Sequence, residues 1–500
     1  MQQQGDQIDV FFNPRSVAVV GASKSVYKAG HVIFKNFAEN RTRGIFKGEL
    51  YAINPNETEI LSYKCYPSLS RVIDAIDVVV VVVPAAFVAQ VMREAAAKKV
   101  KAAVIVSSGF REVGNTALED EVKTIARNAD MRLLGPNCLG VYDSRSGVDM
   151  LFLPETKVLQ NGNEVVITPR PVPGNLAIVT QSGAFGVAAL DYLAGREMGV
   201  SKFVSFGNKA DVNEPELLSY LERDEKTRVI LLYVEAITAG REFLQVAKRV
   251  TRTKPIIALK SGKTSSGARA AASHTGALSG ADRIYDAAFA QAGVIRARDM
   301  DDFFHIAKGL SAQPPAAGDG IAILTDAGGP GVMAADECET RGIAIRVLSD
   351  ETLQKFEKLK EEQKIPKFAA NLNPVDLTGS ATSEMYELAA KILLDDPGVH
   401  ALIVIGLHHA PGLGEDFIDK TYNVVRQYRK PVTACDIGET EMAMYVRSRF
   451  DKLGIPSYSS PEDAARAIVA LIRYGLYLRK EGCYGEYLAN MEHKNGRRTN

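Results

Sequence analysis

A run of small residues, 262–280, carries a single histidine, His274. The run shows neither the apolar period of a helix nor the alternation of a strand, so it cannot bury one face in a core. An imidazole on such a loop is suited to act as a nucleophile and then to move, because small side chains hinder backbone rearrangement little. The alternative is a solvated loop in which the histidine has no role.

One acidic residue, Glu235, directly follows the apolar run 229–234. If that run is a strand, the carboxylate lies beside the turn that carries His274 and can accept a hydrogen bond from one ring nitrogen. Such a bond fixes the tautomer, makes the other nitrogen a better nucleophile and stabilises positive charge on the ring. The alternative is a surface acid that caps the next helix.

A third group, Gln181, Ser182 and Gly183, lies between the apolar run 175–180 and a helix of small residues. Backbone N–H groups at a helix start have no partner within the helix, and with the Ser182 hydroxyl they form a site for phosphate or an acyl group. The histidine, the orienting carboxylate and the anion site together indicate phosphoryl transfer through a phosphohistidine.

Strands and helices alternate through residues 1–154, which predicts a domain built on a doubly wound parallel sheet. Ligands of such sheets bind beyond the carboxyl ends of the strands. The candidate binding residues at those ends are Gly21, Ala22, Ser23, Asn54, Pro55, Pro84, Ser108, Gly109 and Asn137. A glycine turn after the first strand favours a nucleotide with its phosphates on a helix start; the alternative is that these glycines only make tight turns.

A nicotinamide dinucleotide fits this first domain poorly. The run that begins at Gly21 does not contain the G-x-G-x-x-G pattern, and the second strand ends in Asn54-Pro55-Asn56, without an acid for a ribose hydroxyl. A dehydrogenase is therefore the less favoured function. Cys138, at the end of the last strand, is expected to be a packed thiol, because no neighbouring base is evident in the sequence.

The rest of the chain repeats one design. Residues 175–186 read like residues 320–331, and residues 254–262 match residues 430–438. We predict two flavodoxin-like α/β domains, 155–314 and 315–480, followed by a polar tail, 481–500. Gly262 and Gly293 are 31 positions apart, whereas the matching Gly438 and Gly454 are 16 apart. A domain that closes without the histidine loop does not need it for stability, which favours a functional role.

The second copy also carries a histidine pair, His408-His409, three residues after the strand that corresponds to the one before Glu235. We expect this pair to be structural or to lie at a subunit interface, and metal binding is less favoured.

Composition excludes several classes of function. Lysine plus arginine equals aspartate plus glutamate, 60 of each, so no net charge draws the chain to nucleic acid or to an anionic membrane. The five cysteines are scattered without metal-binding spacing, which predicts no metal site and a reduced, cytoplasmic setting. The start of the chain shows no signal peptide, and the valine-rich run 78–83 is too short to cross a bilayer.

Short motifs add a family resemblance. Residues 21–23, 54–55, 108–110 and 135–140 resemble the CoA-binding domain of the succinyl-CoA synthetase superfamily. With residues 181–184, 207–211, 273–277 and 373–377, the chain to about residue 480 is similar to the α subunits of ADP-forming, or NDP-forming, acyl-CoA synthetases. The resemblance implies a Rossmann-like CoA-binding domain followed by two succinyl-CoA synthetase-like domains.

The same resemblance implies a reaction. Acyl-CoA and phosphate give acyl phosphate and CoA, and the phosphoryl group passes to His274 and then to ADP; the reverse direction activates an acid. ATP or ADP and Mg²⁺ are expected on a separate ATP-grasp β subunit in an α2β2 assembly, because no such domains are evident in these 500 residues. A non-catalytic CoA-sensing protein is the alternative, and the choice of carboxylic acid stays open.

Overall fold

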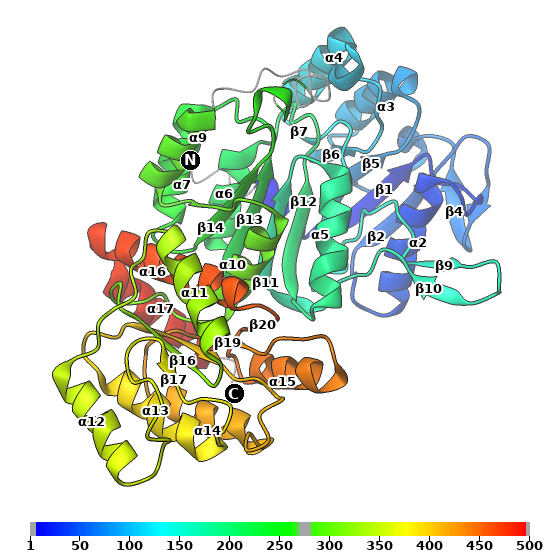
Figure 1. The fold of residues 1–500 in the computed structure, drawn as a ribbon. Coiled ribbons are helices and arrows are strands. Elements are labelled where there is room, and N and C mark those ends of the chain that lie inside the picture. The colour runs from blue at the N-terminus through cyan, green and yellow to red at the C-terminus, as the bar shows by residue number, and fades with distance from the viewer. Residues whose placement is uncertain (1–6, 268, 270–281, 497–500) are drawn as a thin grey trace. The chain divides into compact units, whose positions relative to one another are not determined.

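The chain divides into two compact units, residues 1–296 and 297–500. The computed structural model describes residues 7–267, 269 and 282–496, and Figure 1 shows their ribbon. The predicted nucleophile, His274, lies outside the described residues. Within the described part of the chain, no helix is both long enough and apolar enough to cross a membrane.

The first sheet of the first unit has the strand order β3-β4-β2-β1-β5-β6-β7. Its strands are β1 (Ser16–Val20), β2 (Glu49–Ile53), β3 (Glu59–Ile60), β4 (Tyr63–Tyr66), β5 (Val78–Val81), β6 (Ala102–Ile105) and β7 (Arg132–Leu134). Helices α2 (Ala29–Thr42), α3 (Ala85–Ala97) and α4 (Thr116–Asn128) connect them. Across the sheet from β4 through β2, β1, β5 and β6 to β7, the strands are parallel and follow the dinucleotide-binding order. The direction in which the chain adds strands reverses between β1 and β5. The predicted doubly wound sheet is confirmed.

The second sheet has the order β15-β14-β13-β11-β12-β8. Its strands are β8 (Gly140–Asp143), β11 (Pro173–Thr180), β12 (Val200–Ser205), β13 (Val229–Val234), β14 (Ile256–Lys260) and β15 (Ile295–Arg296). Its helices are α5 (Gly183–Gly195), α6 (Glu214–Arg223), α7 (Gly240–Val250) and α9 (Asp282–Ala292). Strands β11 to β15 have the flavodoxin order. Strand β8, which we placed in the first domain, pairs antiparallel with β12, and a hairpin of β9 (Thr156–Val158) and β10 (Glu164–Val166) follows it.

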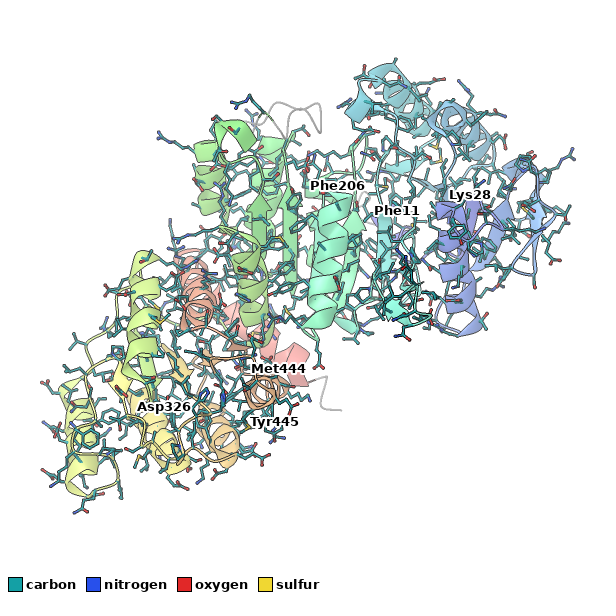
Figure 2. The ribbon with its side chains drawn as sticks, turned by 45° about the vertical axis from the view of Figure 1, so that its right-hand side comes forward. Phe11, Lys28, Phe206, Asp326, Met444 and Tyr445 are labelled. Carbon is teal, nitrogen blue, oxygen red and sulfur yellow. The ribbon has the colours of Figure 1, made fainter. Side chains whose placement is uncertain are left out.

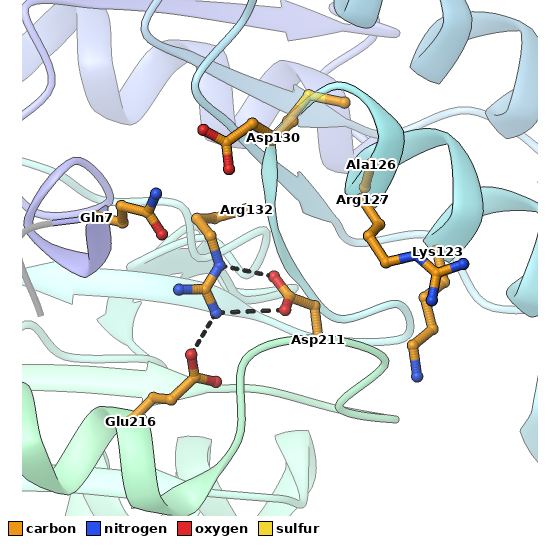
Figure 3. A pocket seen from close by; sticks show the side chains of 9 residues that line it. Gln7, Lys123, Ala126, Arg127, Asp130, Arg132, Asp211 and Glu216 are labelled. Atoms are coloured by element: carbon orange, nitrogen blue, oxygen red, sulfur yellow. Dashed lines mark hydrogen bonds and ion pairs between the residues drawn. The ribbon is translucent and has the colours of Figure 1, made fainter. Parts of the chain in front are cut away.

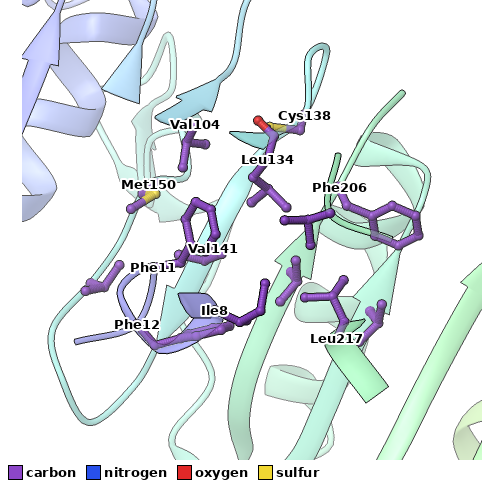
Figure 4. Packing of buried hydrophobic residues seen from close by; sticks show 14 of the residues in the cluster. Ile8, Phe11, Phe12, Val104, Leu134, Cys138, Val141, Met150, Phe206 and Leu217 are labelled. Atoms are coloured by element: carbon purple, nitrogen blue, oxygen red, sulfur yellow. The ribbon is translucent and has the colours of Figure 1, made fainter. Parts of the chain in front are cut away.

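One apolar core runs through both halves of the first unit. Figure 4 shows Phe11 and Phe12 from the start of the chain packed between residues of the two halves, among them Leu134 and Leu217. Phe12 also stacks on Tyr220 of α6, with ring centroids 5.0 Å apart. Each buried aromatic side chain stabilises such packing by about 2–3 kcal/mol. The two sheets are therefore held in a fixed relation, and so are the loops at their strand ends.

The second unit repeats the flavodoxin order as β17-β16-β18-β19-β20. These strands are β16 (Ile321–Thr325), β17 (Val375–Asp376), β18 (Ala401–Ile405), β19 (Val432–Cys435) and β20 (Ser457–Tyr458). The helices are α10 (Met300–Ala312), α11 (Gly328–Thr340), α12 (Asp350–Glu361), α13 (Ser383–Asp395), α14 (Asp416–Val425), α15 (Glu441–Lys452), α16 (Pro461–Lys480) and α17 (Tyr484–Gly496). The shared order supports the internal duplication inferred from the sequence.

Two segments differ from the predicted domain limits. Helix α10 precedes the predicted boundary at residue 314, but it belongs to the second unit, where Lys308 lies 2.7 Å from Asp451. Residues 484–496 of the predicted polar tail form α17, because Cys483 and Tyr487 lie one helical turn apart and are both buried. The Tyr487 ring lies 5.3 Å from that of Tyr474. The domain limits themselves stay predictions.

Candidate functional site

The turn after β11 is built around Thr180, which is fully buried. Its hydroxyl donates to the Ser182 carbonyl oxygen at 2.8 Å and accepts from the Ser182 amide at 3.1 Å. Ser182 is the N-cap of α5, and its Oγ accepts from the Phe185 amide at 3.3 Å. The capping oxygen acts as an acceptor, so the hydroxyl can still donate to an anion at the helix start. The predicted anion site thus lies directly beyond a strand end.

Glu235 lies at the point where the strand order of the second sheet reverses, between β11 and β13. Its backbone N–H donates to the Gln181 Oε1 at 3.0 Å, and that of Ala236 donates to the same oxygen at 3.3 Å. The Glu235 residue is 7% exposed, and α7 begins only at Gly240, with Ala239 at its N-cap. The alternative that Glu235 caps this helix is therefore wrong. Gln181 has a positioning role that the sequence did not predict.

The second unit repeats this arrangement at its own sheet. Thr325 exchanges the same two hydrogen bonds with Ala327, at 2.9 and 3.0 Å. Asp326, the counterpart of Gln181, accepts from the Leu407 amide at 3.1 and 3.2 Å. Both copies therefore join the two strands at the reversal point through one side chain. What distinguishes the first copy is the carboxylate of Glu235, because the second copy has Gly406 directly after its strand.

The Asp326 carboxyl makes the second unit sensitive to pH. Burial raises the pKa of Asp326 to about 6, and the charge of Asp376 adds to the effect. An unfolded aspartate titrates near pH 3.9, so the folded state holds the proton more tightly between about pH 4 and 6. Rising pH in that window therefore lowers the free energy of unfolding, by at most about 3 kcal/mol.

We expect Asp326→Asn to remove this loss of stability at higher pH. The amide oxygen can still accept from Leu407, but it does not ionise. The midpoint of thermal unfolding of the variant should exceed that of the wild type by more at about pH 8 than at about pH 4.5, as followed by calorimetry on the full chain. Asp319→Asn is the matched control, since the Asp319 side chain is 64% exposed. A midpoint difference that is equal at both pH values would contradict the assignment.

The histidine pair of the second unit has local partners. The Nδ1 of His408 lies 2.8 Å from the Oδ1 of Asp436, and its Nε2 lies 3.3 Å from the Thr440 hydroxyl. The ring of the exposed His409 lies 3.9 Å from that of His408. The described residues contain no group of three or more histidine, cysteine, aspartate or glutamate side chains that could hold a metal ion. These contacts agree with the expected structural role of His408.

The turn after β1 carries the first predicted binding residues, Gly21, Ala22 and Ser23. Gly21 has a φ of +94°, and a Cβ there would lie 2.2 Å from the Val82 carbonyl oxygen. A Cβ on Gly30, in the first turn of α2, would lie 2.0 Å from the Gly21 carbonyl oxygen. Both glycines are therefore needed for tight packing at the reversal point between β1 and β5. This agrees with the tight-turn alternative and also brings the start of α2 to the strand ends.

The remaining predicted residues of the first sheet also follow strand ends. Asn54, directly after β2, donates from Nδ2 to the Ala22 carbonyl oxygen at 2.7 Å and so joins two strand-end turns. The other positions are the exposed Pro55, the exposed Pro84 at the N-cap of α3, the exposed Ser108 and Gly109 after β6, and Asn137 after β7. Cys138 is buried, as expected of a packed thiol, and burial raises the pKa of the thiol to about 12.

The strand-end turns of the two sheets adjoin. The Leu139 amide, after β7, donates to the Ser205 Oγ at the end of β12 at 3.2 Å. The Asn137 Nδ2 lies 3.4 Å from the Asn208 Oδ1. Gly207 packs against the same loop, where a Cβ would lie 2.3 Å from the carbonyl oxygens of Pro136 and Asn137. The turn after β7 and the turn after β12 are therefore in direct contact within the first unit.

We expect Gly207→Ala to destabilise this junction. Gly207 has a φ of +53°, and the new methyl group would meet two backbone oxygens that cannot rotate away. The free energy of unfolding should fall by about 2–4 kcal/mol, measured from urea denaturation of the full chain. Gly195→Ala at the end of α5 is the control, because its Cβ would meet no atom of the described residues within 4 Å. Equal unfolding midpoints for both variants would contradict the prediction.

Comparison with known proteins places this site in a family. Family models match a CoA binding domain over residues 15–144, a succinyl-CoA ligase like flavodoxin domain over 173–310 and a Ligase-CoA domain over 321–475. The α subunit of ADP-forming acetate–CoA ligase II from Pyrococcus furiosus is 38% identical, over 93% of this chain and 97% of its own length. This chain belongs to the α subunits of the ADP-forming acetate–CoA ligase family.

Two further similar proteins agree with this. Acetyl-coenzyme A synthetase 1 of Ca. Korarchaeum cryptofilum, solved with phosphate and ADP, is 36% identical with a TM-score of 0.84, covering 95% of this chain and 98% of that one. The ADP-forming 4-hydroxybutyrate–CoA ligase of Nitrosopumilus maritimus is 33% identical over 93% of this chain, which spans only 64% of its length. The predicted family and the predicted fold class are confirmed.

Proposed function

We propose that this α subunit interconverts acyl-CoA, ADP and phosphate with the free acid, CoA and ATP, through acyl phosphate and a phosphohistidine on His274. One observation carries the proposal: a buried carboxylate, Glu235, lies at the reversal point of the sheet copy that also contains the histidine loop. The other copy has a glycine at the matching position and lacks the loop. Glu235 and the histidine loop therefore occur together in one copy, and the other copy forms the same type of sheet without them.

In the phosphoryl step on this chain, a ring nitrogen of His274 forms a bond to phosphorus. The bond from phosphorus to the acyl oxygen breaks, and a carboxylate leaves. Glu235 accepts a hydrogen bond from the other ring nitrogen and stabilises the positive charge that develops on the ring. The first amides of α5 and the Ser182 hydroxyl bind the phosphoryl oxygens, which helix starts favour. The proposal covers carboxylic acids as a class, because the relatives include ligases named for acetate and for 4-hydroxybutyrate.

The turns of the first sheet are proposed to hold CoA, which supplies the thiol that exchanges with phosphate on the acyl carbon. Gly21 and Gly30 let α2 pack closely on the turn after β1, which brings the helix start, a favourable site for phosphate, to the strand ends. Lys28, exposed at the N-cap of α2, has no side-chain capping bond and adds positive charge there (Figure 2). The exposed Ser108, with Gly109 and Asn137, extends this surface toward Gln181 and Ser182. The residues present therefore fit a CoA nucleotide.

The nucleotide-dependent half of the reaction is proposed to need a separate ATP-grasp subunit that binds ATP or ADP with Mg²⁺, in an α2β2 assembly. The α subunit from Pyrococcus furiosus is covered over 97% of its length, whereas the longer 4-hydroxybutyrate–CoA ligase is covered over 64%. The additional third of that relative is the part to which an ATP-grasp region would belong. For the α subunit described here, we expect the ATP-grasp region on a partner chain.

Acetyl phosphate labelled on phosphorus tests the proposed half-reaction on this chain alone. We expect an acid-labile, base-stable phosphate that peptide mapping places on residue 274. Adding ADP without a partner should leave the label on the chain, and adding an ATP-grasp subunit should transfer it to ADP. CoA binding measured by calorimetry without any labelling would instead favour the CoA-sensing alternative. Label on another residue would refute the assignment of His274.

A further inference from the structure

The segment 207–212, called here the bridging segment, leaves β12 of the second sheet and pairs with the first sheet. Its amides at Asn208 and Ala210 donate to the carbonyl oxygens of Pro136 and Gly135, both at 3.0 Å. The Val212 amide donates to the Leu133 carbonyl oxygen at 3.1 Å. The bridging segment thus runs antiparallel to the end of β7 and to the turn that follows β7. The bridging segment is therefore a backbone connection between the two rows of strand-end turns.

A partly buried charge cluster anchors the far end of the bridging segment. Asp211 accepts from the Arg132 Nε at 2.9 Å and from the Leu133 amide at 2.8 Å, and Arg132 also donates to Glu216 at 2.6 Å. Figure 3 shows the contacts of Arg132 with Asp211 and Glu216, which line a hollow of about 230 Å³ at the amino end of β7. Because the Arg132 guanidinium and the Leu133 amide both hold Asp211, they also restrict the positions of the neighbouring Asn208 and Lys209.

Asn208 reaches the CoA side of the junction. Its Nδ2 donates to the Oε2 of Glu112 at 2.6 Å and to the Oε2 of Glu119 at 2.9 Å. The other oxygen of Glu112 accepts from the Gly109 amide at 2.5 Å and from the Phe110 amide at 3.1 Å. Burial would raise the pKa of Glu112, but these hydrogen bonds hold it below its usual value. Asn208 thus fixes a carboxylate that itself fixes the loop after β6.

Lys209 reaches the phosphoryl side. Its ammonium donates to the Glu214 Oε1 at 2.6 Å and to the Ala236 carbonyl oxygen. Ala236 directly follows Glu235, and the amides of both residues are bound by Gln181. The Lys209 side chain is 7% exposed and that of Glu214 is 0% exposed, so water screens this pair little. Gln181 therefore binds two amides of the Glu235 turn, and Lys209 binds a carbonyl oxygen of the same turn.

We propose that two adjacent residues of the bridging segment serve the two halves of the site separately, Asn208 as a positioning residue for CoA and Lys209 as a positioning residue for phosphoryl transfer to His274. This inference rests on the proposed function. The family resemblance marked residues 207–211 as a motif without giving them a role, and the contacts of Asn208 and Lys209 supply one. Because neighbouring residues on one chain segment act on different turns, substitutions at each should affect different measurements.

Two variants on the full chain test this division. Removing a hydrogen bond to a charged group costs roughly tenfold in affinity, so Asn208→Ala should raise the Kd of CoA about tenfold, measured by calorimetry. The rate at which acetyl phosphate labels this variant should stay within about twofold of the wild type, since Gln181 and Lys209 still bind the Glu235 turn. Glu112→Ala frees the same loop from the other side and should weaken CoA binding in the same way.

Lys209→Met should show the opposite pattern. It removes the cation that holds the Ala236 carbonyl oxygen, so labelling of His274 should slow by about tenfold or more while the Kd of CoA changes less than about twofold. Lys209→Arg should restore part of the rate, because a cation returns. Lys226→Met, at an exposed lysine of the same half, is the control for loss of a surface charge.

The outcomes separate this inference from the proposed function. If Asn208→Ala and Lys209→Met each change both measurements to the same extent, or change neither, the division of roles is wrong. If the wild-type chain is not labelled on His274, the proposed function fails, and the CoA measurements still decide the role of Asn208. If Lys209→Arg labels no faster than Lys209→Met, the positive charge of Lys209 is not what positions the turn, and its assigned role falls.

Discussion

Replacing His274 by asparagine is expected to abolish labelling by acetyl phosphate and to lower the overall acid–CoA ligase activity by at least about 10⁴-fold. Asparagine has no ring nitrogen that can bond to phosphorus, so the route through a phosphoenzyme is closed. The loss should appear in kcat rather than in the KM for CoA. The reason is that the candidate CoA residues lie on the turns of the first sheet, which the substitution at residue 274 leaves unchanged.

Two controls accompany the His274 variant. CoA binding by calorimetry should stay within about twofold of the wild type, because the turns of the first sheet keep their contacts. His31→Asn changes another histidine of the same unit, one whose Nδ1 lies 2.8 Å from the Ser23 carbonyl oxygen, and it should leave His274 able to take up label. Label that persists on the His274→Asn chain at the wild-type rate would mean that another residue is the nucleophile.

Strand ends could be read from the sequence because each one leaves a local mark. Strand β5, residues 78–81 of the valine run, is fully buried, as expected for a parallel strand covered on both faces, and Gly21 marks the turn after β1. The duplication was also visible, since repeated local patterns such as Thr180-Gln181 and Thr325-Asp326 encode the same turn. These features located the candidate residues on strand-end turns before any contact between the turns was known.

Contacts between distant residues could not be read in the same way. Gln181 and the Glu235 turn are 54 positions apart, and Asn208 and Glu112 are 96 apart. Nothing in either local pattern names the partner, because a side-chain amide is equally suited to solvent, to a ligand or to a backbone N–H. The motif at residues 207–211 was recognised, but its connecting role appears only when both sheets are in place.

The domain limits show the same restriction. Residues 140–143 lie within the predicted first domain, but they form β8, which pairs with β12 across the expected boundary. Helix α10 likewise follows the second sheet in sequence and packs in the second unit. In both cases tertiary packing, which a local pattern does not contain, determines the domain to which the element belongs.

Replacing Glu235 by glutamine is expected to slow phosphoryl transfer to His274 by about 10–100-fold or more. Glutamine has nearly the same shape, and the bond to Gln181 comes from the backbone N–H of residue 235, so the turn should keep its conformation. What changes is the charge. A neutral amide stabilises the positive ring less, and its weaker acceptor leaves the tautomer of His274 less well defined.

The labelling rate with acetyl phosphate measures this effect directly. Glu222→Gln is the matched control, because that carboxylate pairs with Arg249 at the surface and should leave the rate within about twofold. A Glu235→Gln chain that labels as fast as the wild type would show that the carboxylate charge is not used. Glu235→Gly goes further, since it introduces the residue that the second copy carries after β18. If Glu235→Gly retains more than about a tenth of the wild-type rate, the carboxylate is not what makes the first copy catalytic, and the histidine loop alone distinguishes the two copies.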